Sequence, residues 1–361
     1  MTWLALRGAD GIARRFGTTC LPDSLPRGTL TVELDLSQFA HKAAPVLRLR
    51  SGAEPTKIFT MERMADGRMH LLRSDGQHVS NLSIGLGREP VSGWLRLTYH
   101  WDTNCQRSLL TSENLTAGTI RQQEIPDAMP LCLEDVRSLF VSERGCQRHP
   151  AVGWFALGDH LQPVGPTPGL AGSTMIGTPD GPRPLNTLRA GDMVLTADNG
   201  PQPVIWRGGV SVPSMGAFRM IRLLAPYFGS SSDLLVQPSQ RIAISGAEVE
   251  YLFGEDEVLV DARHLVNGQT AIWDEENTLV NCHGLLLATH ELVQADGCWV
   301  DSLFIGRIAK NPDLARTTAP GSVVSARDLP IHTAPVRREL LEFEAQTLVL
   351  AHARSRAPFA A

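Results

Sequence analysis

The sequence predicts an all-β dominated protein: a jelly-roll-like N-terminal sandwich, a second β-fold and a C-terminal helix. Three observations carry this prediction. Apolar and polar residues alternate over many short stretches, as they do in half-buried strands. Turn signals built from Gly, Pro, Asn and Asp separate these stretches. Apolar residues recur at helical spacing near the C-terminus, over residues 336–352.

Length and composition bound the class of protein. A chain of 361 residues suggests two or three domains, and 43% hydrophobic with 20% charged residues fits an ordinary soluble protein. The net charge of −5 gives no electrostatic argument for a nucleic-acid partner. No stretch is long and apolar enough to span a bilayer. The six cysteines form no CxxC pair and are too scattered for a disulfide scaffold.

The start of the chain bears on localisation. Residues 1–7 hold too short an apolar run for a cleaved signal peptide. We therefore expect a cytoplasmic protein by default. Export by a route that needs no cleaved N-terminal signal is the alternative.

Residues 1–165 are expected to form the sandwich. Strands are indicated at 30–36 and 94–101, where apolar residues occupy every second position, and a hairpin is indicated around Ala65–Gly67. Residues 136–141 and 153–157 are expected as the closing elements. Many short strands at this spacing favour a sandwich.

The layout of these strands loosely resembles concanavalin-like jelly rolls, which often bind glycans. On that resemblance four residues could form a sugar platform: Trp94, Tyr99, His100 and Trp101. The alternative, which we favour, places these side chains in the sandwich core and on the strand surface. The expected partner is therefore an unknown protein or a glycan.

A linker and a tail divide the rest of the chain. Residues 162–172 hold three prolines and three glycines, which neither a helix nor a central strand tolerates. We predict domains at 1–165, 166–306 and 307–361. The last part is expected as an extended wrap and then a helix from Val336 to His352 that docks on its own chain. Its predicted apolar face comprises Val336, Leu340, Phe343, Thr347 and Leu350, widened by Leu341 and Leu348.

Short strands and strong turns alternate between Gly169 and Trp206. Residues 193–196 are expected as a buried strand, and Asp198-Asn199-Gly200-Pro201 as a hairpin turn, because Asn and Gly tolerate positive φ. Residues 204–206 resume the sheet.

This order of parts resembles the opening of a Hint domain, the fold shared by inteins and the autoprocessing domain of hedgehog proteins. It is most similar to the Hint proteins of alphaproteobacteria. The resemblance implies autoproteolysis or protein splicing. The matching positions are Thr174, Ile176, Thr178, Gly181, Pro184, Leu188, Gly191, Asp192, Val194, Leu195 and the turn at 198–200.

The same register places family active-site positions on residues that lack the required chemistry. The nucleophile, a Cys or Ser in the family, falls on Gly169, which has no side chain to attack a carbonyl. The second motif, which carries a Thr or Ser and a general-acid His, falls on Gln237 and Gln240, and glutamine cannot shuttle a proton. The late motif keeps His290 but has Asp296 in place of Asn.

The resemblance with these substitutions predicts a catalytically inactive Hint domain that acts as a scaffold or binding module. Two alternatives stay open. Ser173 or Thr174 could serve as a displaced nucleophile for residual autoprocessing, and the N-terminal sandwich could bind a glycan. We expect no cofactor and no metal. Cys282, His283, His290 and Cys298 could suggest zinc, but His283 and His290 would face opposite sides of an unbroken strand.

Overall fold

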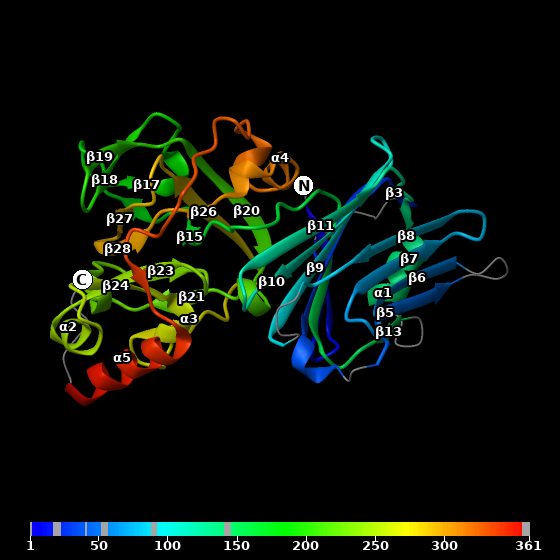
Figure 1. Cartoon of the computed structure of the whole chain (residues 1–361), viewed down its shortest axis with the longest axis horizontal. Helices are drawn as coiled ribbons and strands as arrows, with labels where there is room; N and C mark the ends of the chain where they lie inside the picture. The colour runs from blue at the N-terminus through cyan, green and yellow to red at the C-terminus, as the bar shows by residue number, and fades with distance from the viewer. Residues whose placement is uncertain are drawn as a thin grey trace. The chain divides into compact units, whose positions relative to one another are not determined.

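The computed structural model describes residues 2–16, 23–39, 42–51, 57–87, 92–140 and 146–355 (Figure 1). The chain divides into two compact units, Met1–Gln162 and Pro163–Ala361. The finer division at 165 and 306 stays a prediction. Both units consist mainly of antiparallel strands, so the all-β fold class is confirmed.

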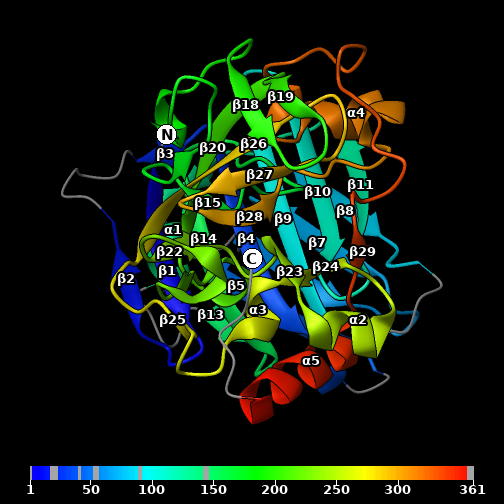
Figure 2. The same cartoon turned by 90° about the vertical axis from the view of Figure 1, so that its left-hand side faces the viewer.

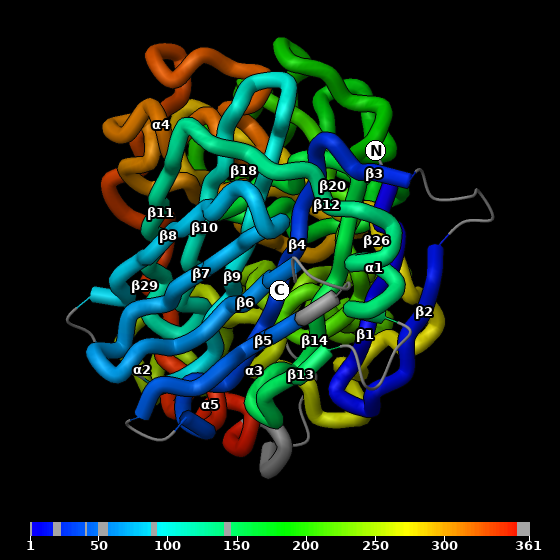
Figure 3. The backbone as a smooth tube through the Cα atoms, turned by 90° about the vertical axis from the view of Figure 1, so that its right-hand side faces the viewer, coloured from blue at the N-terminus to red at the C-terminus, as the bar shows by residue number. Residues whose placement is uncertain are grey.

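The first unit is a β-sandwich of two large sheets. The seven-stranded sheet has the order β11 (Thr119–Ile125), β10 (Arg107–Asn114), β9 (Trp94–Asp102), β4 (Arg27–Asp35), β14 (Val152–Gly158), β1 (Trp3–Gly8) and β2 (Ala13–Arg15). The five-stranded sheet, which faces the viewer in Figure 3, has the order β13 (Cys146–Arg148), β5 (Ala44–Ser51), β6 (Lys57–Arg63), β7 (Met69–Ser74) and β8 (Val79–Ile84). A short pair joins β3 (Ser24–Leu25) to β12 (Leu131–Cys132).

The alternation of apolar residues builds the core of this sandwich. Leu30, Val32 and Leu34 of β4 are buried beside their partners on β9. Tyr99 and Trp101 lie on the same face, each 1% exposed, with ring centroids 5.5 Å apart. These two aromatic side chains therefore belong to the core and cannot form a sugar platform. His100 is also buried, whereas Trp94 is exposed.

One closing element differs in type from the strands around it. Residues 136–140 lie in helix α1 (Leu133–Phe140), which buries Val136, Leu139 and Phe140. Their spacing of three and four residues puts them on one helical face. The other closing element, at 153–157, is strand β14 as expected.

The second unit contains a six-stranded and a nine-stranded sheet. The first has the order β20 (Trp206–Pro213), β26 (Leu279–Leu286), β15 (Leu170–Ala171), β22 (Leu234–Val236), β21 (Ile221–Leu223) and β25 (Ala271–Trp273). Seven strands of the second follow the order β17 (Arg183–Pro184), β16 (Met175–Ile176), β27 (Leu292–Ala295), β28 (Cys298–Asp301), β23 (Arg241–Ser245), β24 (Glu257–Asp261) and β29 (Arg338–Glu339). The other two, β18 (Met193–Thr196) and β19 (Gly200–Pro203), pair with each other, and β18 also pairs with β27. The predicted hairpin at 198–201 is confirmed, because Thr196 of β18 pairs with Gly200 of β19.

Helices are short in this unit. They are α2 (Ala247–Phe253), α3 (Ala262–Leu265), α4 (Pro312–Arg316) and α5 (Glu342–Ser355), and α5 packs against α2 and α3 (Figure 2). Single 3₁₀ turns occur in the chain at 36–38, 185–187, 216–218, 227–229, 308–310 and 320–322. Among the described helices, none has the length and apolar character needed to cross a membrane.

The C-terminal helix begins later than the spacing of apolar residues predicts. Residues 338–339 form β29 instead, which pairs in parallel with β24. The Glu344 side chain accepts the backbone N–H of Leu341 at 2.8 Å, and this cap marks the start of α5. The predicted face is wrong in part: Leu340 and Leu348 are buried as expected, but Phe343 and Leu350 are exposed and Ala345, which was not predicted, is buried.

Candidate functional site

The structure places Gly169 beside the turn that carries both glutamines. Leu170 of β15 pairs with Val236 of β22 on one side and with His283 of β26 on the other. The Gly169 carbonyl oxygen accepts the backbone N–H of Gln237 at 2.7 Å. Three of the positions singled out in the sequence, Gly169, Gln237 and Gln240, are thus brought together.

Gln240 fills the space into which a side chain at residue 169 would project. A Cβ atom built on Gly169 would lie 2.4 Å from Gln240 Oε1 and 2.9 Å from Gln240 Cβ. Real Cβ atoms do not approach other atoms so closely, so even alanine requires a shift. The cavity that remains between Gly169, Gln240 and Ser302 has a volume of about 10 Å³. That is about the minimum for one water molecule, so no substrate fits.

Asp301, at the end of β28, holds this arrangement in place. Its Oδ1 accepts Gln240 Nε2 at 2.6 Å and the Arg241 backbone N–H at 3.1 Å, and its Oδ2 lies 3.3 Å from Arg241 Nε. The Asp301 carbonyl oxygen accepts Gln240 Nε2 at 2.9 Å. The amide of Gln240 therefore donates to Asp301.

His290 connects to the same carboxylate but has no free nitrogen. Its Nδ1 accepts the backbone N–H of Val336 at 3.0 Å, so the proton of the neutral ring lies on Nε2. Nε2 is 3.1 Å from both Asp301 Oδ2 and the Ser302 carbonyl oxygen. The His290 side chain is 1% exposed. The C-terminal segment thus covers and fixes the one histidine that the family register retains.

The two candidate replacement nucleophiles lie outside this cluster. Neither Ser173 nor Thr174 lines the cavity at Gly169. Thr174 is buried: its backbone N–H donates to the carbonyl oxygen of Ala171, and its carbonyl oxygen accepts the backbone N–H of Leu185. Ser173 is exposed. Ser302 does line the cavity, but its hydroxyl oxygen accepts the backbone N–H of Glu291 at 3.0 Å.

Cys282 is the thiol on the strand that pairs with β15, opposite Ala171. It is buried, and Gln237 Nε2 lies 3.1 Å from its sulfur. Burial raises the pKa of the Cys282 thiol to about 12. The thiol therefore stays protonated at neutral pH, and only a thiolate would be an effective nucleophile.

Cys282, His283, His290 and Cys298 are the side chains that could suggest a zinc site. Within the described ranges, no three His, Cys, Asp or Glu side chains gather in a way that could hold a metal ion. His283 points toward Gly172, where an added Cβ would lie 2.8 Å from His283 Cδ2.

Sequence reasoning missed two parts of this cluster. One is Asp301, whose signal in the sequence is a carboxylate that directly follows the apolar residues of β28, because a buried carboxylate needs partners. The contact of Val336 with His290 joins residues far apart in the chain, and no local pattern marks it.

Comparisons with solved structures find likenesses of low identity and low TM-score. The first unit is similar to the CBM40 of an IT-sialidase from Ruminococcus gnavus, which was solved with bound alpha2,3 sialyllactose. It has 12% identity, covers 38% of this chain and 78% of that one, and has a TM-score of 0.28. A bacterial intein-like domain from Clostridium thermocellum has 12% identity, 38% and 99% coverage and a TM-score of 0.29. The MchDnaB-1 intein has 15% identity, 37% and 98% coverage and a TM-score of 0.27.

With TM-scores below 0.5, these likenesses support no inference about activity or ligand. No curated protein is similar enough to this chain to count as a match. The family model of the Hint domain, however, matches residues 168–307, the segment that contains Gly169, Gln240 and His290. Residues 168–307 of this chain are a Hint domain.

Proposed function

We propose that this Hint domain does not process its own chain and instead serves as a scaffold or binding module. The contact between Gln240 and Gly169 is the observation that carries the proposal, because it fills the place of a nucleophile. The family positions in this chain are thus Gly169, Gln237, Gln240 and His290, with the first three unable to supply nucleophile or proton.

Autoprocessing needs a sequence of bond changes that these residues cannot perform. A thiol or hydroxyl must attack the carbonyl carbon of residue 168, and the C–N bond to residue 169 must break as its nitrogen takes a proton. Gly169 offers no attacking atom. Gln240 offers no transferable proton, and its amide hydrogens are donated to Asp301.

Residual autoprocessing through a displaced hydroxyl is the competing proposal. An N–O acyl shift by Ser173 or Thr174 would require either hydroxyl to reach the carbonyl of Pro168. Such reactions lose rate steeply with displacements of about 1 Å. Since neither residue lines the cavity at Gly169, the geometry favours the silent domain.

A binding role for this unit is supported by apolar side chains that remain exposed. Tyr251 of α2, Leu341 and the α5 residues Phe343 and Leu350 are each more than half exposed. The two helices are in contact. Exposed apolar groups of this size on neighbouring elements are typical of protein-binding surfaces.

Mass spectrometry of the intact chain tests the proposal. The purified protein is incubated with a thiol or with hydroxylamine, either of which would cleave an ester or thioester. We expect no cleavage between Pro168 and Gly169. Cleavage that a Ser173→Ala or Thr174→Val variant abolishes would support the displaced nucleophile and refute the silent domain. Cleavage that both variants retain would also refute it, with Ser302→Ala as the next variant to examine.

Glycan binding by the first unit remains the third candidate. Two of the aromatic residues that suggested it, Tyr99 and Trp101, do not support it, because they are buried in the core.

A further inference from the structure

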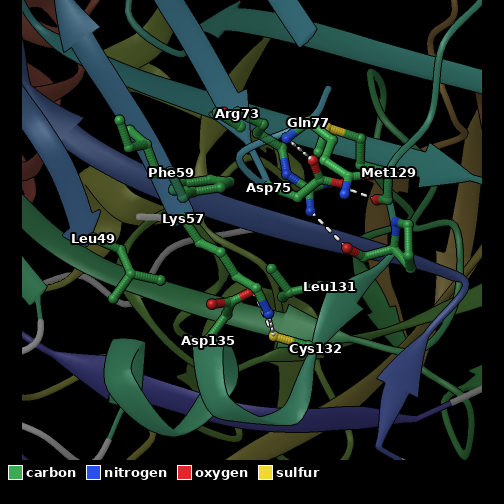
Figure 4. A pocket seen from close by; sticks show the side chains of 13 residues that line it. Leu49, Lys57, Phe59, Arg73, Asp75, Gln77, Met129, Leu131, Cys132 and Asp135 are labelled. Atoms are coloured by element: carbon green, nitrogen blue, oxygen red, sulfur yellow. Dashed lines mark hydrogen bonds between the residues drawn. The ribbon is translucent and has the colours of Figure 1, made fainter. Parts of the chain in front are cut away.

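A pocket in the first unit, far in sequence from the Hint domain, has no role in the function proposed above. It has a volume of about 320 Å³ and is lined by β5, β6, β7, the turn after β7, residues 129–132 and the start of α1 (Figure 4). This volume lies at the lower end of the range for small-molecule sites, about 300–1,000 Å³. Apolar side chains of Leu49, Phe59, Met129 and Leu131 form part of its wall.

Arg73 brings a buried positive charge to this pocket. It is 5% exposed and lies about 6 Å from the rings of Phe59, Tyr99 and Trp101. Its guanidinium donates to Tyr99 Oη and to the carbonyl oxygens of Met129 and Pro130, all of them uncharged. These bonds use three of the five N–H donors of arginine. In the part of the chain that is described, no carboxylate forms an ion pair with Arg73.

Lys57 brings a second positive charge to the same side of the sheet. Phe59 pairs with Arg73 across β6 and β7, so Lys57 is the diagonal neighbour of Arg73, about 7–8 Å away between backbones. Lys57 Nζ lies 3.6 Å from Cys132 Sγ. Cys132, followed by Asp135, raises the pKa of the Lys57 ammonium, which is therefore charged at neutral pH. Among the described residues Lys57 also lacks an ion pair within 4.0 Å.

Two carboxylates and an amide complete the lining. Asp135 Oδ2 accepts the thiol of Cys132 at 2.8 Å, and Asp75 Oδ1 accepts the backbone N–H groups of Gln77 and His78. Asp75 and Gln77 lie at the exposed rim. Within the described residues, neither Asp75 Oδ2 nor the side-chain amide of Gln77 has a hydrogen-bond partner. Figure 4 shows Lys57 and Asp135 at one end of the pocket and Arg73, Asp75 and Gln77 at the other.

We propose that this pocket binds a small hydroxylated organic acid. Arg73, which forms no ion pair with a described carboxylate, holds the carboxylate of the ligand, and Lys57 at the other end of the pocket donates to one of its hydroxyl groups. Asp75 and Gln77 accept and donate hydrogen bonds to hydroxyl groups, and Phe59 and Leu131 contact the carbon skeleton. A simple anion would leave the rim groups unused, and a neutral sugar would leave Arg73 without an anion. The proposal is independent of the one made for the Hint domain.

Calorimetric titration of the full chain with three probes tests this class of ligand. Glucuronate carries both a carboxylate and hydroxyl groups, glucose lacks the carboxylate, and benzoate lacks the hydroxyl groups. We expect saturable one-to-one binding of glucuronate, with glucose and benzoate weaker by about tenfold or more.

Two lysine variants locate the binding. Lys57→Met is expected to weaken glucuronate binding by about tenfold or more, because it removes one charged contact. Lys42→Met changes an exposed lysine of the same unit that does not line the pocket, and it should leave binding unchanged. Arg73 is left intact because its buried contacts also support the sandwich.

Four results would overturn the proposal. These are no binding of glucuronate at millimolar concentration, equal binding of glucose, equal binding of benzoate, and equal loss in both lysine variants. A melting temperature equal to that of the wild type in each variant establishes that weaker binding does not result from unfolding. If Lys57→Met melts lower, Lys57→Gln takes its place, and unchanged affinity in that variant would refute the assignment.

Discussion

The surroundings of Gly169 and of Arg73 differ in a way that reverses the expectation from sequence. Gly169 lies at the position to which a recognisable motif assigns chemistry, yet its cavity measures about 10 Å³. Arg73 and Lys57 belong to no motif, yet they line a pocket of about 320 Å³.

The difference lies in how polar groups are partnered. Around Gly169, Asp301 accepts hydrogen bonds from Gln240, Arg241 and His290, so these three donors share one buried carboxylate. Around Arg73, the positive charges have only neutral partners or no ion pair. A site whose groups satisfy one another is structural, whereas a pocket with unmatched charge is suited to a ligand.

The largest expected effect comes from removing the centre of the first cluster. Asp301→Ala should lower the free energy of unfolding by about 3–5 kcal/mol, because Gln240, Arg241 and His290 lose a common buried partner. Urea denaturation measures the change. Asp313→Ala is the matched control, since that side chain is 77% exposed and its loss should cost less than about 0.5 kcal/mol. Similar values for both variants would show that the cluster is not structural.

Acid should destabilise the fold through a buried histidine of the first unit. Burial lowers the pKa of His100 in the first unit from 6.5 to about 4. The unfolded chain therefore binds a proton that the folded chain does not, and stability falls as pH drops from 6.5 toward 4. The loss is on the order of 3 kcal/mol. Denaturation at pH 7 and at pH 4.5 measures it, and His100→Gln should reduce the difference. An unchanged difference would place the acid sensitivity elsewhere, for example at His332, whose pKa burial also lowers.

A smaller loss of stability is expected when a Cβ atom is added at residue 169. Gly169→Ala should cost about 1–3 kcal/mol, because its Cβ would overlap Gln240. Gly85→Ala is the control, since an added Cβ there meets nothing within 4 Å. It should change stability by less than about 1 kcal/mol. A neutral Gly169→Ala would mean that the cavity can open and would weaken the comparison with the pocket.

The smallest effect belongs to the surface of the second unit. Phe343 is 65% exposed, so Phe343→Ser should change the free energy of unfolding by less than about 0.5 kcal/mol. Leu348→Ala on the buried side of the same helix should cost about 2–5 kcal/mol. Chemical denaturation of the two variants orders them. A large loss in Phe343→Ser would mean that this side chain supports the fold and is not a free surface.

Much of the fold was predictable because it depends on local patterns. The alternation in β4 and β9 and the turn at Asp198–Pro201 specify strands and a hairpin within a few residues. The type of residues 136–140 was harder to predict, since a short apolar run fits a strand or a helix until its partners are known. The start of α5 depended on the pairing of Arg338–Glu339 with β24, which is remote in sequence.

The candidate site was predictable only as a set of positions. The register with the family placed Gly169, Gln237, Gln240 and His290, and the structure shows the first three in contact and His290 joined to Gln240 through Asp301. That Gln240 fills the space beside Gly169 is a matter of packing between β15 and the turn before β23, and residue types alone do not encode it. The pocket at Arg73 likewise arises from strands and a crossing segment that meet only in the folded chain.

The intact mass of the full chain after prolonged incubation with hydroxylamine tests the central claim most directly. A Hint domain whose nucleophile space is filled should show no break between Pro168 and Gly169. Cleavage by hydroxylamine at the Asn-Gly bonds of residues 199–200 and 267–268 is a separate reaction and is told apart by the fragment masses. Two fragments whose masses correspond to cleavage between Pro168 and Gly169 would contradict the account.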